Sequence, residues 1–367
     1  MTAHHGLDEQ QLRYLFAIKQ IKGVGDVNAL KLFNHFGNAQ TIFEATEAQL
    51  KQVGVKNTSI SSINSMDFNQ FDNVFEWLNK TDASVIPIHS PYYPPLLLQT
   101  STPPLYLFTL GNYELLLSPQ IAVIGSRSPT PIGSNNTQQF CKELVNQGIT
   151  ITSGLAQGID GEAHRSALSN NGYTIAVSGT GLKTVFPAPH KKLAHEIADK
   201  GLIISENFPD QGVIAGCFPK RNRIIAGLSL GTLVVEAAEK SGSLITAKIA
   251  LEEAREVFAI PGSIHNPLAK GCHSLIKQGA KLVEKIEDIL EELPTLASAQ
   301  KLATNIETRP TLNKDSAEFL KHVDYEITSI DTILNRSQLG IESVANKLLL
   351  LELDGWIINS AGGYTRI

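Results

Sequence analysis

Apolar positions in the first 80 residues recur at helical spacing. Leu12, Leu15, Phe16 and Ile18 lie mainly on one stripe of a helix. A glycine turn at 23–25 follows, then a helix that ends at Gly37, and a further helical segment that ends in a similar turn near residue 54. The pattern predicts a helical domain over 1–80, in which helices are paired across glycine turns.

The composition changes to proline between residues 81 and 118. Proline restricts both its own backbone and that of the residue before it to extended conformations. We therefore expect an ordered, extended connection with one or two edge strands, packed on the domain that follows. Six prolines mark it: Pro87, Pro91, Pro94, Pro95, Pro103 and Pro104.

Residues 119–292 alternate short apolar runs with helical patterns. Strands are expected over 121–125, 149–152, 173–178, 202–205, 232–237 and 256–262, and helices over 131–148, 161–170, 191–201 and 244–254. A long loop is expected between 206 and 231. Short β-rich runs joined by helices are typical of a parallel, doubly wound α/β sheet.

The end of the chain has a different pattern. Residues 293–310 are polar and weakly patterned, and are interpreted as a linker. Residues 311–367 contain three helical stretches and two strand-like pieces around Gly362 and Gly363, which is the outline of a winged helix.

Composition and charge limit the function classes. With 367 residues, 42% hydrophobic and 18% charged, the chain is expected to fold into two or three domains. No apolar run approaches the ~18 residues that span a bilayer, and the start has no export pattern. Three scattered cysteines, Cys141, Cys217 and Cys272, are too few for a disulfide framework or a zinc site. We expect a cytoplasmic protein with no membrane, metal or cofactor.

Small residues gather where the predicted strands end, at 125–127, 153–158, 178–181 and 241–243. Ligands of a doubly wound sheet bind at the carboxyl ends of its strands. Glycine allows a close approach of the backbone, and helix N-termini offer free N–H groups to an anion. We therefore expect a phosphate site in these loops, with the candidate residues Gly125, Ser126, Gly154, Gly179, Ser241 and Gly242.

Two common phosphate motifs are absent from the chain. Dinucleotide binding requires G-x-G-x-x-G after the first strand and an acidic residue after the second. The sequence has GSRSPTPIG at the first place and Ser153 at the second. No Gly-Lys-Ser/Thr follows a four-residue spacer, so a P-loop is excluded as well.

Basic residues concentrate after residue 216 although the whole chain has a net charge of −5. Residues 216–281 hold 9 Lys and Arg against 5 Glu, and Lys220, Arg221, Asn222 and Arg223 follow Phe218. Arg127, between a strand end and a helix start, has a guanidinium that can fork onto a phosphate. Cations along a backbone with a ring for base stacking are typical of single-strand binding. The alternative for 218–223 is a solvated helix start with Phe218 in the core.

Catalytic groups are poorly represented. A catalytic triad could be built only from Ser153 or Ser178, His164 or His195, and Asp160 or Glu236. The G-x-S-x-G motif of a nucleophile elbow is absent. Asp160 is interpreted as the N-cap of the helix that follows it. Gly231 and Thr232 with Glu236 resemble part of a phosphate motif in Rossmann proteins of the lysine-decarboxylase-like group. A nucleotide-processing enzyme of that group is therefore the alternative function.

Four longer stretches resemble the DprA/Smf family, DNA processing protein A. They are AVIGSR (122–127), SGLAQGID (153–160), FPKRNRIIAGLSLGTLVVEAAEKSGSLITA (218–247) and EVFAIPGSIHNPLAKGCHSLIKQGAKLV (256–283). The resemblance implies an extended Rossmann core over 119–292, flanked by a SAM-like, helix-hairpin-helix N-terminal domain and the winged helix.

The resemblance also implies a function. A family member would bind single-stranded DNA without catalysis, protect incoming strands in natural transformation, load the recombinase RecA and form a homodimer through the core. By position, Arg127, Phe218, Arg221, Asn222 and Arg223 would line the DNA pocket. Lys191 or Lys192 would match a family lysine after the third core strand.

Three features limit this picture. The family usually carries His or Asn shortly before the FPxRNR stretch, where this chain has Gly216 and Cys217. The winged helix has 5 Lys and Arg against 8 Asp and Glu, so we expect it to contact protein or only to assist on DNA. The turn at 23–25 can present N–H groups to a phosphate, but with few cations near it in sequence a packing role is favoured.

Overall fold

The computed structural model describes residues 7–293, 314–324, 328–353, 356–360 and 362–366. The chain divides into two compact units, Met1–Leu293 and Pro294–Ile367, which are described separately. The linker predicted over 293–310 lies outside the described residues, apart from Leu293. Within the described part, no helix combines the length and the apolar character that crossing a membrane requires.

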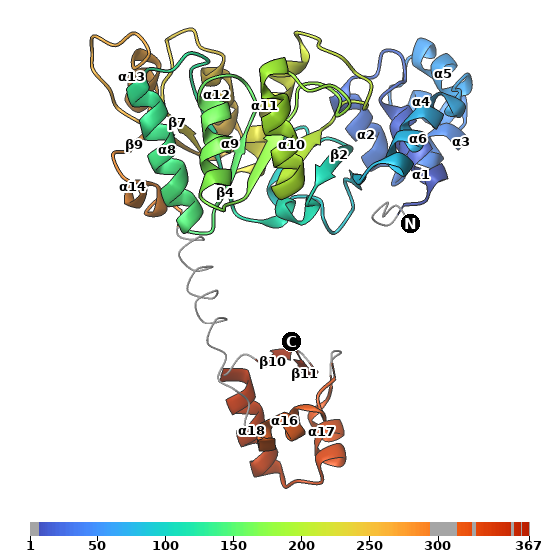
Figure 1. The fold of residues 1–367 in the computed structure, drawn as a ribbon. Helices are drawn as coiled ribbons and strands as arrows, with labels where there is room; N and C mark the ends of the chain where they lie inside the picture. Colours follow the sequence, from blue (N-terminus) through green and yellow to red (C-terminus); the bar gives the residue numbers. More distant parts are fainter. Residues whose placement is uncertain (1–6, 294–313, 325–327, 354–355, 361, 367) are drawn as a thin grey trace. The chain divides into compact units, whose positions relative to one another are not determined.

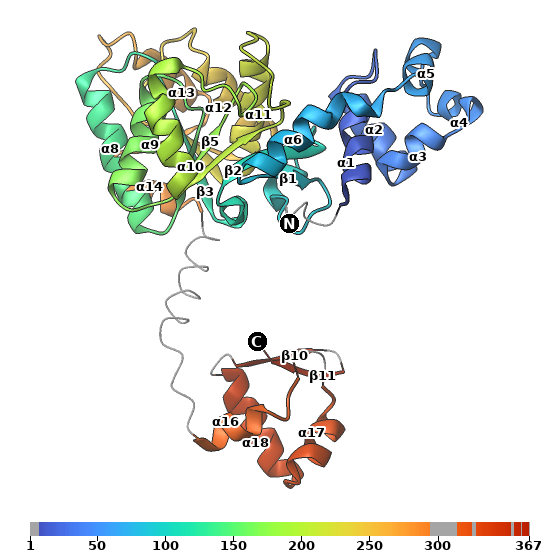
Figure 2. The same ribbon diagram turned by 45° about the vertical axis from the view of Figure 1, so that its right-hand side comes forward.

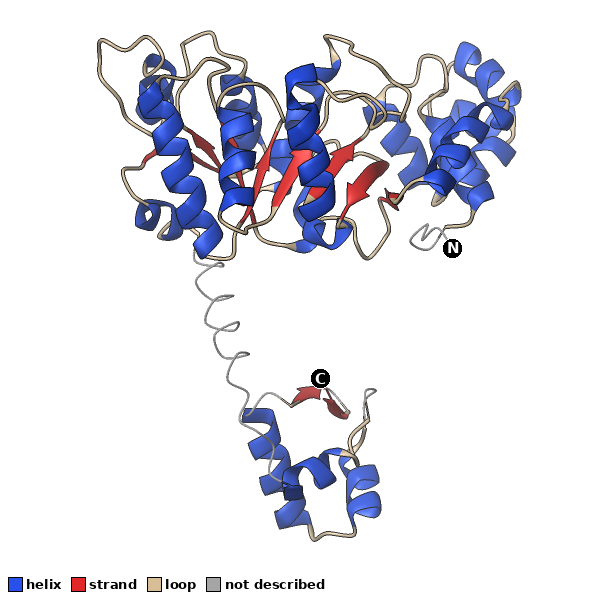
Figure 3. Ribbon diagram, in the orientation of Figure 1, coloured by secondary structure: helices blue, strands red, loops and turns tan. Residues whose placement is uncertain are grey.

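A mostly parallel sheet forms the centre of the first unit (Figure 3). Its nine described strands lie in the order β1-β2-β6-β5-β4-β3-β7-β8-β9, and only the β1–β2 and β2–β6 pairs are antiparallel. Their bounds are β1 Ala83–Pro87, β2 Tyr106–Gly111, β3 Gln120–Ile124, β4 Thr150–Ser153, β5 Thr174–Val177, β6 Leu202–Ser205, β7 Gly231–Val234, β8 Glu256–Ala259 and β9 Lys281–Leu282. The doubly wound α/β class predicted from the sequence is confirmed.

The apolar runs become strands because both faces of the sheet are covered. Strands β3 to β7 are buried at every position, which is why polar and apolar residues do not alternate between an exposed and a buried face. Where they carry polar side chains, as in β4, these are buried as well. The helices α8 (Pro131–Asn146), α9 (Ile159–Ser169) and α10 (Lys191–Lys200) lie side by side on one face (Figure 1). The other face carries α11 (Cys217–Leu228) and α12 (Ser243–Glu252), and the chain continues through α13 (Lys270–Lys277) and α14 (Ile286–Leu290).

The proline-rich segment supplies the antiparallel edge of the sheet. Strands β1 and β2 come from it, with the short helix α7 (Pro95–Leu98) between them. Pro87 ends β1, where the missing N–H of proline is tolerated. The prediction of one or two edge strands in an ordered connection therefore agrees with the structure.

Residues 7–80 are mainly helical and pack against this antiparallel edge (Figure 2). Their helices are α1 (Glu9–Ile18), α2 (Asp26–Phe36), α3 (Ala39–Glu44), α4 (Glu47–Gln52), α5 (Asn57–Asn64) and α6 (Asp72–Lys80). Gly37 ends α2 in the left-handed conformation, as the sequence predicts. The ring of Phe16 lies 5.0 Å from that of Tyr106 and 5.7 Å from that of Phe208, so α1 shares its hydrophobic core with the sheet.

The second unit has the predicted outline of a winged helix. Its helices α16 (Lys314–Leu320), α17 (Ile330–Ser337) and α18 (Ile341–Leu353) precede an antiparallel hairpin of β10 (Ile357–Ser360) and β11 (Gly363–Arg366). Eight buried apolar residues form its own core, among them Phe319, Ile333 and Leu348.

One element was predicted wrongly. The segment expected as a long loop between 206 and 231 contains the twelve-residue helix α11. The start of this helix was considered only as the alternative for 218–223; Pro219 falls in its first turn, where a backbone N–H has no helical partner and proline is tolerated.

Candidate nucleic-acid interface

A cleft of about 960 Å³ opens where the strand order reverses, between β3 and β7. Its walls come from the loop after β3, the start of α11 and the loop between β7 and α12. Eight of the predicted site residues line it: Gly125, Ser126, Arg127, Phe218, Arg221, Asn222, Ser241 and Gly242. A smaller adjoining hollow of about 240 Å³ adds Gly154 and shares Arg127, Phe218 and Arg221.

The helical periodicity of α11 selects which residues face the cleft. One face of the helix lines the cleft, because residues three or four positions apart lie on the same side of a helix. This face carries Phe218, then Arg221 and Asn222, then Ile225. Lys220 and Arg223 are also three apart, but they lie on the other side. A run of cations that looks continuous in sequence is thereby divided between two surfaces.

Arg127 is an exposed cation of the cleft. It lies between the end of β3 and Thr130, the N-cap of α8, whose hydroxyl accepts a hydrogen bond from Gly133 N at 3.0 Å. Its guanidinium has no hydrogen bond or ion pair with any residue that the structure describes. Five donors are therefore free for a bidentate contact with phosphate.

Arg221 is buried and forms hydrogen bonds within the wall of the cleft. Its Nη1 donates to the carbonyl oxygens of Gly154 and Val177, at the ends of β4 and β5. A Cβ at position 154 would lie 2.5 Å from this nitrogen, so a larger residue there would displace the guanidinium from its present place. Burial lowers the pKa of Arg221 to about 10, against the opposing charge of Asp160, and the side chain stays cationic at neutral pH.

Asp160 has a different role from the helix N-cap that was predicted. The N-cap of α9 is Gly158, and the Asp160 carboxylate accepts hydrogen bonds from the N–H groups of Gly154 (3.1 Å) and Ala156 (3.4 Å). Burial raises the pKa of Asp160, while Arg221 and these N–H groups lower it. The carboxylate therefore balances Arg221 and fixes the loop after β4.

Two aromatic rings form one wall. Phe218 and Phe186 have ring centroids 5.3 Å apart at an interplanar angle of 48°, and Phe186 is 42% exposed. A Cβ at Gly179 would lie 2.6 Å from the Phe218 ring, so glycine at 179 allows the ring to occupy its place. Phe218 is half-buried and lines the cleft, which excludes a purely core position.

The facing wall is the loop before α12. Ser241 Oγ and Ser243 Oγ are 2.7 Å apart, and exposed Lys240 adds a second cation to the cleft. Lys240 and Phe186 were missed by sequence reasoning. Lys240 directly precedes the Ser-Gly-Ser loop, which is a usable signal, whereas no local pattern brings Phe186 to Phe218.

Lys220 and Arg223 do not reach the cleft, which corrects their assignment to it. Arg223 Nη2 lies 2.6 Å from the buried carboxylate of Glu206, and its Nη1 donates to the carbonyl of Thr102. Lys220 Nζ lies 2.7 Å from Asp26, in α2. Both side chains connect α11 to other elements of the fold, Lys220 to α2 and Arg223 to Glu206 and Thr102, and neither lines the cleft.

Lys191 is also separate from the cleft. It begins α10 and lines another cavity, of about 390 Å³, together with Ser178 and His195. The predicted DNA contact of Lys191 therefore stays a prediction, since this residue does not line the cleft that Arg127 and Phe218 share.

No serine triad is assembled from the candidates considered. Ser153 Oγ donates to the carbonyl of Val123, and His164 Nδ1 is 2.6 Å from Thr174 Oγ1. The Glu236 carboxylate accepts hydrogen bonds from Thr130 N at 2.9 Å and Thr130 Oγ1 at 2.6 Å. These contacts give Glu236 a structural role at the start of α8.

Buried His164 predicts an acid-sensitive fold. Burial lowers the pKa of His164 to about 3, and its Nε2 has no hydrogen-bond partner. Below pH ~6.5 the unfolded chain takes up a proton that the folded chain refuses, so stability falls as the pH falls. Denaturation with urea should show a loss of about 1.4 kcal/mol per pH unit between pH ~6 and ~5 from this residue. His164→Gln should remove this slope, and an equal slope in the variant would contradict the assignment.

Comparisons with known proteins agree with this architecture. Residues 84–294 match the family model described as DNA recombination-mediator protein A, and residues 306–363 match the DprA winged helix domain. The protein Smf of Escherichia coli K12 is 43% identical over 323 residues, covering 87% of this chain and 86% of the relative.

Two solved structures are similar. The X-ray structure of DNA processing protein A (DprA) from Streptococcus pneumoniae matches with a TM-score of 0.69 and 37% identity, over 76% of this chain and 97% of that one. DNA processing protein A from Helicobacter pylori, whose structure is described as showing a single-stranded DNA binding mode, matches with a TM-score of 0.53 and 31% identity, over 59% and 97%. The chain therefore belongs to the DprA/Smf family of DNA-processing proteins.

Proposed function

We propose that this protein binds single-stranded DNA in the cleft between β3 and β7 and does so without catalysing a reaction. The observation that carries the proposal is that Arg127, a cation without a partner among the described residues, lines the same cleft as the rings of Phe218 and Phe186. Cations hold the phosphates and a ring stacks a base whose face is exposed only in a single strand.

The cleft favours weak sequence preference. Apart from Asn222, Thr246 and the Asp160 carboxylate, which the loop after β4 already engages, its polar groups are cations, glycine backbone and serine hydroxyls, which suit phosphate and sugar rather than base edges. Stacking on a ring tolerates every base because each has a π-face. Any single strand that fits the volume therefore satisfies the same contacts.

The enzymatic alternative has less support. Its candidate acid, Glu236, is 7% exposed, is held by Thr130, and does not line the cleft. The one carboxylate that lines the cleft is Asp160, which is engaged by two backbone N–H groups beside Arg221. This arrangement suits binding better than proton transfer.

The physiological role rests on the family. A DNA recombination mediator that holds single strands would protect incoming DNA in natural transformation and load RecA onto it, working as a homodimer through the core in the cytoplasm. RecA filament formation on strands coated with single-strand-binding protein, with and without this protein, tests the loading step. Equal filament growth in both reactions would remove RecA from the proposal.

Arg127→Ala should weaken binding to oligo-dT and flatten its salt dependence. Each phosphate contact adds about 0.7 to the slope of log K against log salt for a single strand, so the slope should fall by about that amount. Fluorescence anisotropy at several salt concentrations measures it. Lys142→Ala is the matched control, because Lys142 is an exposed cation of helix α8 that does not line the cleft. An unchanged slope in Arg127→Ala would remove this residue from the site.

A parallel assay separates the two functions. The purified protein is incubated with nucleoside mono- and triphosphates and the products are separated chromatographically. Turnover without oligo-dT binding would favour the nucleotide-processing enzyme, whereas strand binding without turnover supports the proposal.

A further inference from the structure

The hollow of about 240 Å³ that adjoins the cleft has lining residues of its own. Gly154, Gln157 and Pro187 line the hollow and not the cleft, whereas Arg127 and the two rings of the aromatic wall line both. A group that enters the hollow can therefore belong to the same molecule that occupies the cleft.

Arg221 lines the hollow with one end of its guanidinium unused. The side chain is 6% exposed, and its Nη1 donates to the carbonyl oxygens of Gly154 and Val177. Its Nε donates to Asn222 Oδ1 at 3.2 Å. Nη2 has no hydrogen-bond partner among the residues that the structure describes. A buried donor without an acceptor costs free energy, so this nitrogen favours a ligand that accepts a hydrogen bond.

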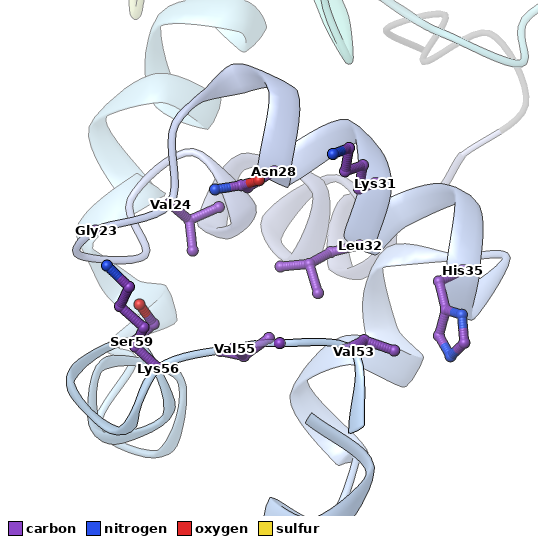
Figure 4. Close-up of a pocket in the computed structure, with 11 residues that line it drawn as sticks. Gly23, Val24, Asn28, Lys31, Leu32, His35, Val53, Val55, Lys56 and Ser59 are labelled. Carbon is purple, nitrogen blue, oxygen red and sulfur yellow. The ribbon is translucent and has the colours of Figure 1, made fainter. Parts of the chain in front are cut away.

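The cavity of the helical N-terminal part has no comparable group (Figure 4). Its volume is about 320 Å³, and its buried polar side chain is Ser59, whose Oγ donates to the carbonyl of Lys22 at 2.8 Å. All its lining residues are described, and no buried side-chain donor among them lacks a partner. The glycine turn beside this cavity fits the packing role favoured from the sequence.

The surroundings of Arg221 suit a neutral acceptor better than a phosphate. The carboxylate of Asp160 offsets the charge of the guanidinium. The hollow is bordered by the apolar side chains of Phe186, Pro187 and Phe218, against which a phosphate would lose its water. A nucleobase instead lays a flat apolar face on the rings and turns a carbonyl oxygen or ring nitrogen toward Arg221.

Gln157 supplies a second polar group at the hollow. It is exposed, and its amide has no hydrogen-bond partner in the part of the chain that the structure describes. An amide both donates and accepts, so it can pair with either kind of group on the edge of a base. Arg127, which lines the hollow and the cleft, can hold the phosphate of the same nucleotide.

We propose that the hollow receives one nucleobase turned out of the bound strand, with its edge hydrogen-bonded to Arg221 Nη2 and to Gln157. This inference rests on the proposed function, because the cleft holds the rest of the strand. Turning out a base costs least in a single strand, where it has no pairing partner. Every natural base carries an acceptor for a guanidinium, so the hollow recognises the presence of a base edge, in keeping with weak sequence preference.

The test compares three oligomers of equal length by fluorescence anisotropy on the full chain. They are oligo-dT, an oligomer in which difluorotoluene, an apolar isostere, replaces thymine, and an abasic oligomer with the same sugar-phosphate backbone. Stacking alone gives equal affinity for the first two. The hollow requires a base that accepts a hydrogen bond, so oligo-dT should bind about tenfold more tightly than the isostere, or more.

Gln157→Leu should reduce this ratio of affinities by about 2-fold to about 10-fold, because one hydrogen bond to the base is lost without a change in charge. The matched control is Gln139→Leu, since Gln139 is exposed on α8 and lines neither the cleft nor the hollow. It should leave the ratio as in the unsubstituted protein.

Two results would overturn the base hollow: equal binding of oligo-dT and its isostere, or a ratio that is the same in Gln157→Leu and Gln139→Leu. In either case, tighter binding of both than of the abasic oligomer would leave single-strand binding by the cleft in place. Absence of binding to all three oligomers would remove the proposed function and this inference together.

Discussion

Glu206→Gln should destabilise the first unit by about 3–5 kcal/mol, the cost typical of removing one partner from a buried ion pair. The Glu206 carboxylate is 3% exposed and lies 2.6 Å from Arg223 Nη2, 3.3 Å from Lys19 Nζ and 3.9 Å from Lys220 Nζ. Glutamine has nearly the same shape as glutamate but no charge, so the cations around it would repel one another without a carboxylate between them. Urea denaturation followed by tryptophan fluorescence measures the change.

Two variants make this result specific. Glu196→Gln removes an exposed carboxylate paired with Lys200 at 3.3 Å, and should change the free energy of unfolding by less than ~1 kcal/mol. Adding Lys19→Gln to Glu206→Gln removes one uncompensated cation and should recover part of the loss. Burial lowers the pKa of Lys19, which is consistent with a charge that depends on its partner. A loss no larger than that of Glu196→Gln would contradict the role of this cluster.

Phe218→Ala should weaken oligo-dT binding by about 5-fold to about 150-fold, because base stacking on an aromatic ring contributes ~1–3 kcal/mol per base. The substitution removes no charge, so the slope of log K against log salt should be the same as for the unsubstituted protein. Anisotropy titrations at two salt concentrations measure both quantities. Gly179→Ala should have a smaller effect in the same direction, since its Cβ would meet the Phe218 ring.

Tyr173→Ala is the control for loss of an exposed ring. Tyr173 is 54% exposed and lies outside the cleft, just before β5. It should leave binding unchanged, and urea denaturation of all three variants verifies their folding. A Phe218→Ala protein that binds oligo-dT as tightly as the Tyr173→Ala protein would remove stacking from the mechanism.

Much of the fold was predictable because strands buried on both faces of a parallel sheet tend to form short apolar runs. The runs at 121–125, 202–205 and 256–262 each coincide with most or all of a strand, and the glycine at 37 ends a helix as expected. Helix α11 was predicted only as the alternative for 218–223, because no local pattern there distinguishes a loop from the first turns of a helix, where proline is tolerated.

The site was predictable only where it is local in sequence. Loops at strand ends must gather at one edge of a parallel sheet, so Gly125, Arg127 and Gly242 were found. The orientation of Lys220 and Arg223 depends on the helical state of α11 and on the buried carboxylate of Glu206, 14 residues before Lys220. Tertiary packing, rather than any spacing, decides such cases.

Helix α11 has one further consequence. Its cleft face and its Glu206 face are fixed to each other by a rotation of about 100° per residue. A single residue inserted or deleted between Phe218 and Arg223 would rotate these side chains by about 100° relative to each other, so they could no longer both keep their present places. Length variation among relatives should therefore be confined to the loops on either side of this segment, since a change within it would disturb either the cleft or the junction with α1 and α2.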